Sequence, residues 1–313
     1  MAGLVSPFAP GDAATFGDAN LKFRHTLDRS PLFSDARLMR LIEQTPRDRY
    51  HVNTPGPGDG SRAEWREGAM DGLSGEQVFE AVARGALWVH LQRVGETDRA
   101  YAELLDTLFA EIEDQVPGLE TYKRSMSILI SSPNLRVAYH CDVPGQMLWQ
   151  VRGRKTLHIY PPRAPFLPQE ALERIVLREA ADTELAFDPS FEAHATAYEL
   201  TPGDAMHWPL NGPHRVVNGD CMNVSFTTEH WTNDLRAHYA ANYANGLLRK
   251  TFRTGDLSRR TEGFGFNAKL ALAGVHKYVA SRQRKPLKFE VDFRVDPDAP
   301  AGVRDIPATQ LSR

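Results

Sequence analysis

The stretch AYHCDVPGQMLWQVRGRKTLHIYPP, from Ala138 to Pro162, decides how the rest of the chain is interpreted. Its short runs of β-branched and aromatic residues are separated by turn residues, which is typical of antiparallel strands. Residues two apart on a strand point to the same face, so His140 and Asp142 point together while Cys141 points away. Lys155 lies in the last apolar run, where a charged side chain needs an explanation.

The same pattern continues on both sides of this stretch. Short runs rich in β-branched and aromatic residues, divided by turn residues, fill residues 123–231 and predict an antiparallel sandwich or barrel. Within this region Asn218-Gly219 separates two such runs and predicts a hairpin turn. The sequence therefore predicts a mainly β fold with its core at residues 123–231.

Helical patterns flank this β region. Residues 32–46, 74–85 and 97–118 precede it, with Ser74 and Gln77 at the spacing of a capping box. Residues 232–250 and 266–282 follow it, and residues 288–296 end the pattern with a strand. We expect residues 1–122 to form a loose arm and helices packed on the barrel, and residues 232–313 to form C-terminal helices and a tail. No long linker suggests a second, independently folding domain.

Composition excludes several classes of protein. The chain has 313 residues, of which 42% are hydrophobic and 25% charged, with a formal net charge of −3. These values are typical of a globular chain with no general attraction to nucleic acid or membranes, so nucleic acid is an unlikely partner. The two cysteines form no CxxC motif, which argues against a thiolate zinc site. We see no signal peptide or membrane span and expect a cytoplasmic protein.

The chemistry of the β region centres on His140 and Asp142. Two imidazole nitrogens and one carboxylate oxygen on one face of a metal, with open positions opposite, suit non-haem Fe(II). His207 and His214, on either side of a Pro-rich break, could each supply the second histidine. A single H-x-D is most often a surface carboxylate beside a histidine that is already hydrogen-bonded, so the pair by itself is weak evidence for a metal site.

Lys155 gives a second, independent signal. An ammonium group in an apolar strand is unfavourable unless an anion pairs with it. The alternative is a lysine whose stem packs on the strand while its head reaches water. Beside a metal site, a bound dianion is the better partner.

Taken in order, the segments YHCD, VRGRKTLHIYPP, TPGDAMHWPLNGPH and NVSFTTEHW resemble the JmjC/cupin-type Fe(II)- and 2-oxoglutarate-dependent oxygenases, in particular the asparaginyl-hydroxylase-like branch. The resemblance covers residues 125–231 and implies a double-stranded β-helix, also called a jelly roll. It implies that Lys155 binds the distal carboxylate of 2-oxoglutarate, and it favours His214 over His207. The metal ligands and catalytic residues implied are His140, Asp142 and His214.

The sequence also departs from this family. Val137 stands where a threonine often contacts the cosubstrate, and Pro213 replaces an aromatic residue before the distal histidine. Other residues must then help to bind 2-oxoglutarate. The candidates on strands that could reach the barrel interior are Gln146, Asn223 and Ser225.

The resemblance implies an enzyme that couples decarboxylation of 2-oxoglutarate by O2 to hydroxylation of an amino-acid-like group, in a protein, a peptide or a small molecule. N-demethylation is possible chemistry, but hydroxylation is favoured. Two alternatives stay open, namely a cupin metalloenzyme that does not use 2-oxoglutarate and a cupin-like binding or regulatory protein without catalysis. Members of the family often dimerise through C-terminal helices, which suggests a homodimer.

Overall fold

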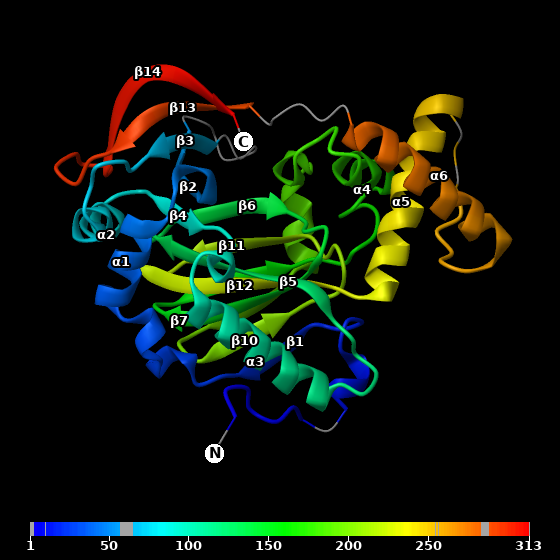
Figure 1. Cartoon of the computed structure of the whole chain (residues 1–313), viewed down its shortest axis with the longest axis horizontal. Helices are drawn as coiled ribbons and strands as arrows, with labels where there is room; N and C mark the ends of the chain where they lie inside the picture. The colour runs from blue at the N-terminus through cyan, green and yellow to red at the C-terminus, as the bar shows by residue number, and fades with distance from the viewer. Residues whose placement is uncertain are drawn as a thin grey trace.

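The computed structural model describes residues 3–9, 11–56, 65–253, 255, 257–282 and 288–312 (Figure 1). Two sheets face each other, and helices cover the outer face of each. In β2 (Tyr50–Pro55) buried side chains alternate with more exposed ones, because one face of the strand meets the core.

The larger sheet has mixed character and extends well beyond the barrel. All its neighbours pair antiparallel except β3 and β13, which run parallel. In spatial order its strands are β1 (Leu21–Arg24), β10 (Asp204–His207), β7 (Gly145–Arg152), β12 (Asn223–Trp231), β5 (Tyr122–Ser131), β4 (Trp88–Leu91), β2 (Tyr50–Pro55), β3 (Trp65–Ala69), β13 (Lys288–Val295) and β14 (Val303–Ser312).

The smaller sheet closes the barrel. Its strands, in spatial order, are β6 (Arg136–His140), β11 (His214–Asn218), β8 (Lys155–Ile159) and β9 (Thr196–Leu200). An apolar cluster fills the space between the two sheets, with Leu148 and Met206 from the larger sheet against Leu157, Ile159 and Val216 from the smaller one. The strands of the two facing sheets that build the barrel all pair antiparallel and form a jelly roll, so the predicted fold class is confirmed.

Helices from both ends of the chain pack on the barrel. The outer face of the larger sheet is covered by α1 (Asp35–Gln44), α2 (Gly75–Arg84) and α3 (Arg99–Gln115), whose buried residues join the main core. The capping box at Ser74 and Gln77 is present. Beside the smaller sheet lie α4 (Gln169–Val176) and α5 (Asn233–Phe252), and α6 (Gly263–Ser281) packs on α5. In the described part of the chain, no helix is both long and apolar enough to cross a membrane.

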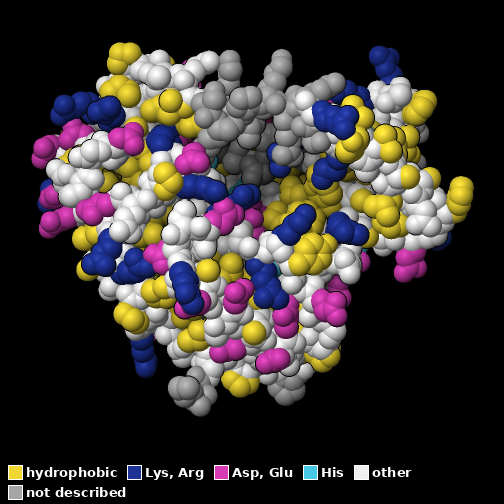
Figure 2. Space-filling model, in the orientation of Figure 1, with side chains coloured by type: hydrophobic (Ala, Val, Ile, Leu, Met, Phe, Trp, Pro, Cys, Tyr) yellow, Lys and Arg dark blue, Asp and Glu magenta, His cyan; other side chains and the backbone are white. Residues whose placement is uncertain are grey.

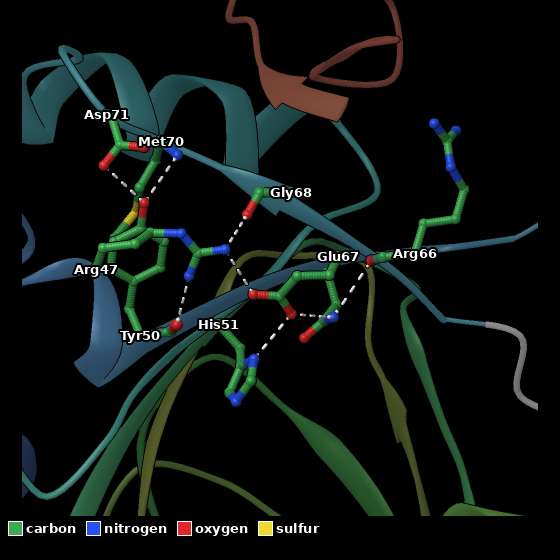
Figure 3. A network of polar contacts seen from close by, with 9 residues as sticks. Arg47, Tyr50, His51, Arg66, Glu67, Gly68, Met70 and Asp71 are labelled. Atoms are coloured by element: carbon green, nitrogen blue, oxygen red, sulfur yellow. Dashed lines mark hydrogen bonds and ion pairs between the residues drawn. The ribbon is translucent and has the colours of Figure 1, made fainter. Parts of the chain in front are cut away.

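A polar network holds the extension of the larger sheet together (Figure 3). The Glu67 carboxylate on β3 accepts hydrogen bonds from Arg47 Nη2 at 3.1 Å and from Asn53 Nδ2 at 2.9 Å, and it lies 2.8 Å from His51 Nδ1. Arg47 also donates to the backbone oxygen of Gly68 at 3.0 Å. These bonds tie β3 to β2 and to the residues that precede β2, and Arg47 also packs over the rings of Tyr50 and Phe289.

Two expectations need correction. Asn218-Gly219 is not a hairpin turn, because β11 pairs with β6 and β8 whereas β12 pairs with β5 and β7. The chain crosses there from one sheet to the other, and the buried Asn218 amide donates to Ser131 Oγ and to the Ser132 carbonyl, both at 2.8 Å. The N-terminal arm is not loose, since Leu21 and Phe23 are buried in the main core.

The predicted division of the chain at residues 122 and 231 stays a prediction. Strands of both flanking segments nevertheless continue the sheet of the central region, because β4 pairs with β5 and β1 pairs with β10. We therefore expect the chain to unfold as one unit.

Candidate active site

His140, Asp142 and His214 meet at one end of the barrel. His140 is the last residue of β6, Asp142 lies in the turn that follows, and His214 is the first residue of β11. The register of the smaller sheet sets His214 directly opposite His140, with ring centroids 4.2 Å apart. The three possible ligand atoms all lie within 4.8 Å of one another. Strand pairing therefore brings His214 next to His140, although 74 positions separate them in the sequence.

Backbone carbonyls orient both imidazole rings. Nδ1 of His140 lies 2.7 Å from the Ala138 carbonyl and Nδ1 of His214 lies 3.0 Å from the Gly212 carbonyl, which assigns the proton to Nδ1 in each ring. The lone pair of each ring is then on Nε2, the atom that a metal would use. Burial, together with the neighbouring His140, holds the pKa of His214 well below its usual range, so this ring is neutral at pH 7.

The geometry fits a metal with three facial protein ligands. His214 Nε2 lies 3.4 Å from Asp142 Oδ2. Two adjacent ligands at about 2.1 Å from an octahedral ion would lie about 3 Å apart, so only a small adjustment is needed. Two nitrogens and one carboxylate oxygen match the donor set of non-haem Fe(II) sites.

His207, the other candidate for the second histidine, lies away from the triad. It ends β10 on the face that packs against the N-terminal segment, where its ring stacks on Phe16 with centroids 4.2 Å apart. Its Nδ1 lies 2.9 Å from the Gln146 carbonyl, and burial lowers its pKa to about 4. Among the described residues, His207 does not belong to the group that could hold a metal.

Lys155 is buried inside the barrel, with 5% of its surface exposed. Its Nζ donates to Ser225 Oγ at 2.9 Å, and no carboxylate of the described residues forms an ion pair with it. Burial lowers its pKa to about 7. Among the described residues, the partner of this buried amine is thus a neutral hydroxyl, a costly arrangement for an ammonium group unless an anion binds.

The other three candidates have different surroundings. Ser225 accepts the hydrogen bond from Lys155, and its role in a cosubstrate pocket stays a prediction. Gln146 is buried on the same strand face as Leu148, which points into the barrel. The amide of Asn223 is already used, because its Oδ1 accepts from Gln150 at 2.8 Å and its Nδ2 donates to the Cys221 carbonyl at 2.9 Å.

A cavity of about 800 Å³ opens at the loop that precedes His214, and neither the triad nor Lys155 is among the residues that line it. Its wall includes the loop residues Pro209, Leu210 and Asn211, which come just before His214 in the sequence. His207 and His230 also line it, and burial lowers the pKa of His230 to about 3. The volume is in the range of ligand-binding sites.

Sequence reasoning did not identify three residues of this region. Gln150 has a buried Oε1 without a hydrogen-bond partner among the described residues, and it shares the barrel face of Gln146, so strand alternation could have found it. Asn211 donates to the backbone oxygen of Asp142 at 2.6 Å. His230 lines the cavity at the end of β12. For Asn211 and His230 no local pattern gave a signal.

No family model matches the chain, and no curated protein matches its sequence. Among solved structures, the X-ray structure of YcfD from E. coli is similar in fold. Its TM-score is 0.50 at 16% identity, and the match covers 87% of this chain and 68% of that one.

A second crystal structure, described as the Escherichia coli ribosomal oxygenase YcfD, has a TM-score of 0.49 at 14% identity and covers 88% and 68% of the two chains. The fold shared with the first of these two structures confirms the fold-level resemblance drawn from the sequence.

Proposed function

We propose that this protein is an Fe(II)- and 2-oxoglutarate-dependent oxygenase that hydroxylates an amino-acid-like group. One observation carries the proposal: a His-Asp-His group at the mouth of a jelly-roll barrel whose interior also holds a buried ammonium without a carboxylate partner among the described residues. The metal site alone would also suit a cupin enzyme that does not use 2-oxoglutarate. Lys155 favours an enzyme that binds a dianion.

In this proposal His140, Asp142 and His214 hold Fe(II). The metal with 2-oxoglutarate and O2 supplies the oxidising power for hydroxylation of a C–H bond. The protein supplies ligands of fixed orientation, because each histidine donates its Nδ1 proton to a carbonyl and keeps Nε2 for the metal.

The position of Lys155 suits the far carboxylate of 2-oxoglutarate. In the smaller sheet His214 pairs with Ile159, and Lys155 lies four residues further along β8, a distance of about 13 Å between backbones. The extended side chain of Lys155 and the five-carbon chain of 2-oxoglutarate can together span this distance. The Ser225 hydroxyl, already in contact with Nζ, can also donate to the same carboxylate.

We assign the substrate to the cavity beside the Pro209–Asn211 segment. Its wall combines apolar side chains such as Leu210 and Leu235 with polar and charged groups, among them Asp234 and Arg259, which suits a polar amino-acid side chain better than a lipid. The fold neighbour YcfD is described as a ribosomal oxygenase, so a side chain within a protein is the class to test first. Hydroxylation remains favoured over demethylation.

We further propose a homodimer that forms through the C-terminal helices. Phe264, Val275 and Tyr278 of α6 are 90%, 65% and 60% exposed and lie on one helical face. Figure 2 shows hydrophobic side chains gathered over this part of the molecule. An apolar patch of this kind is typical of a protein interface. Because both cysteines are free thiols, we place the protein in the reducing cytoplasm.

The direct test is turnover of 2-oxoglutarate. Purified protein with Fe(II), ascorbate and 2-oxoglutarate should release succinate, and Asp142→Ala should not. A screen of amino acids, peptides and ribosomal proteins for a gain of one oxygen in mass then identifies the substrate. Absence of succinate from protein that binds Fe(II) at the triad would refute the 2-oxoglutarate assignment.

A further inference from the structure

The loop between β10 and β11, residues 208–213, contacts the triad at more than one point. Its Gly212 amide donates to the Pro209 carbonyl at 2.9 Å and closes a tight turn, and its Pro213 carbonyl accepts from the Tyr160 amide at 2.9 Å. The Gly212 carbonyl orients the ring of His214. The loop is therefore a fixed part of the site.

Asn211 connects this loop to the other half of the triad. Its Nδ2 donates to the backbone oxygen of Asp142 at 2.6 Å across 69 residues of sequence, and only 8% of its surface is exposed. Its φ of 57° lies in the left-handed region, which glycine adopts at less cost. A turn of this shape could be built with glycine, so the asparagine side chain has a use beyond the turn.

We propose that Asn211 is a positioning residue, which holds the backbone of Asp142 so that its carboxylate stays within reach of His214. The inference rests on the proposed metal site. One loop then positions two of the three ligands, His214 through the Gly212 carbonyl and Asp142 through the Asn211 amide. Asn211 also lines the cavity in which we place the substrate.

The test measures metal binding without turnover. The full-length protein, stripped of metal, is titrated with Co(II), and the dissociation constant and the visible absorption bands are recorded. Asn211→Gly keeps the left-handed backbone and removes the amide. Asn211→Asp keeps the size and replaces the donor by an acceptor. Asn134→Gly is the matched control, because Asn134 is exposed, has a φ of 58° and lies outside the site.

We expect both Asn211 variants to bind Co(II) about 10- to 100-fold more weakly, with shifted absorption bands, as is typical when a partner of a metal ligand is lost. Asn134→Gly should match the wild type. Thermal unfolding of the metal-free proteins identifies a variant that fails to fold, in which case the other variant decides.

If a folded Asn211 variant binds Co(II) with wild-type affinity and spectrum, the positioning role is refuted, whatever its melting temperature. His140→Ala separates this result from failure of the proposed function. If that variant also binds Co(II) like the wild type, the metal centre itself has been wrongly assigned.

Discussion

Replacing Lys155 by methionine should change stability and cosubstrate binding in opposite directions. Methionine has a similar length and no charge, so it removes the buried ammonium without opening a cavity. In the protein without cosubstrate, burial lowers the pKa of Lys155 to about 7, whereas the unfolded chain keeps this proton until about pH 10. The folded state thus has to give up a proton that the unfolded state retains.

The sign of the pH dependence follows from this difference. Between pH 7 and pH 10 the unfolded state binds one more proton, so the free energy of unfolding of the wild type rises with pH. The rise amounts to about 1.4 kcal/mol per pH unit, or about 4 kcal/mol over the interval. Lys155→Met should lack this rise and should be the more stable protein at pH 7, by several degrees in melting temperature at about 2 °C per kcal/mol.

Binding of 2-oxoglutarate should respond in the other direction. Without the ammonium, the far carboxylate of the cosubstrate is buried unpaired, which typically costs about 3–5 kcal/mol. Lys155→Met should therefore bind 2-oxoglutarate about two to three orders of magnitude more weakly. Fe(II) affinity should stay unchanged, because Lys155 does not belong to the metal-binding group.

The assays are urea unfolding across pH 7–10 and a 2-oxoglutarate titration followed by the visible absorption of the anaerobic Fe(II) complex. Lys250→Met is a suitable control, because Lys250 is largely exposed and pairs with Glu179 on the surface. A Lys155→Met variant that binds 2-oxoglutarate like the wild type would refute the cosubstrate assignment. A variant that is less stable at pH 7 would show that the ammonium is already well paired in the free protein.

Three further outcomes are expected. Calorimetry should show Fe(II) binding intact in His207→Ala and lost in alanine variants of the proposed ligands, His140, Asp142 and His214; the reverse result would place the metal elsewhere. The dissociation constant of 2-oxoglutarate should rise above pH 7, approaching about tenfold per pH unit as Lys155 loses its proton, and a flat profile would contradict this role. Phe264→Asp should convert a dimer into a monomer in light scattering, and an unchanged mass would exclude α6 as the interface.

Part of the candidate site was accessible from the sequence because its signals are local. His140 and Asp142 are two positions apart, a spacing that predicts a shared direction even though Asp142 lies in the turn after β6, and Lys155 is a charge in an apolar run. The capping box at Ser74 depends on residues three apart. Patterns of this kind act within a few residues, so they can be read without knowing which segments pair.

Other features depended on which strands pair. Asn218-Gly219 has the local chemistry of a hairpin, yet the chain there crosses between sheets, because the buried Asn218 amide bonds to Ser131 and Ser132 far away in the sequence. Likewise, β13 pairs parallel to β3 although more than 200 residues separate them. Local propensity is weaker than the burial that such long-range pairing achieves.

The sequence by itself determined the class of fold, the strand that carries His140, and the presence of a lysine within an apolar run. Only the tertiary structure decided that His214 meets this strand while His207 packs on the opposite face against Phe16. It alone revealed the bond from Asn211 to Asp142. The physical reason is that the residue types are fixed along the chain, whereas the distances between ligands are fixed by the register of strands that pair far apart in sequence.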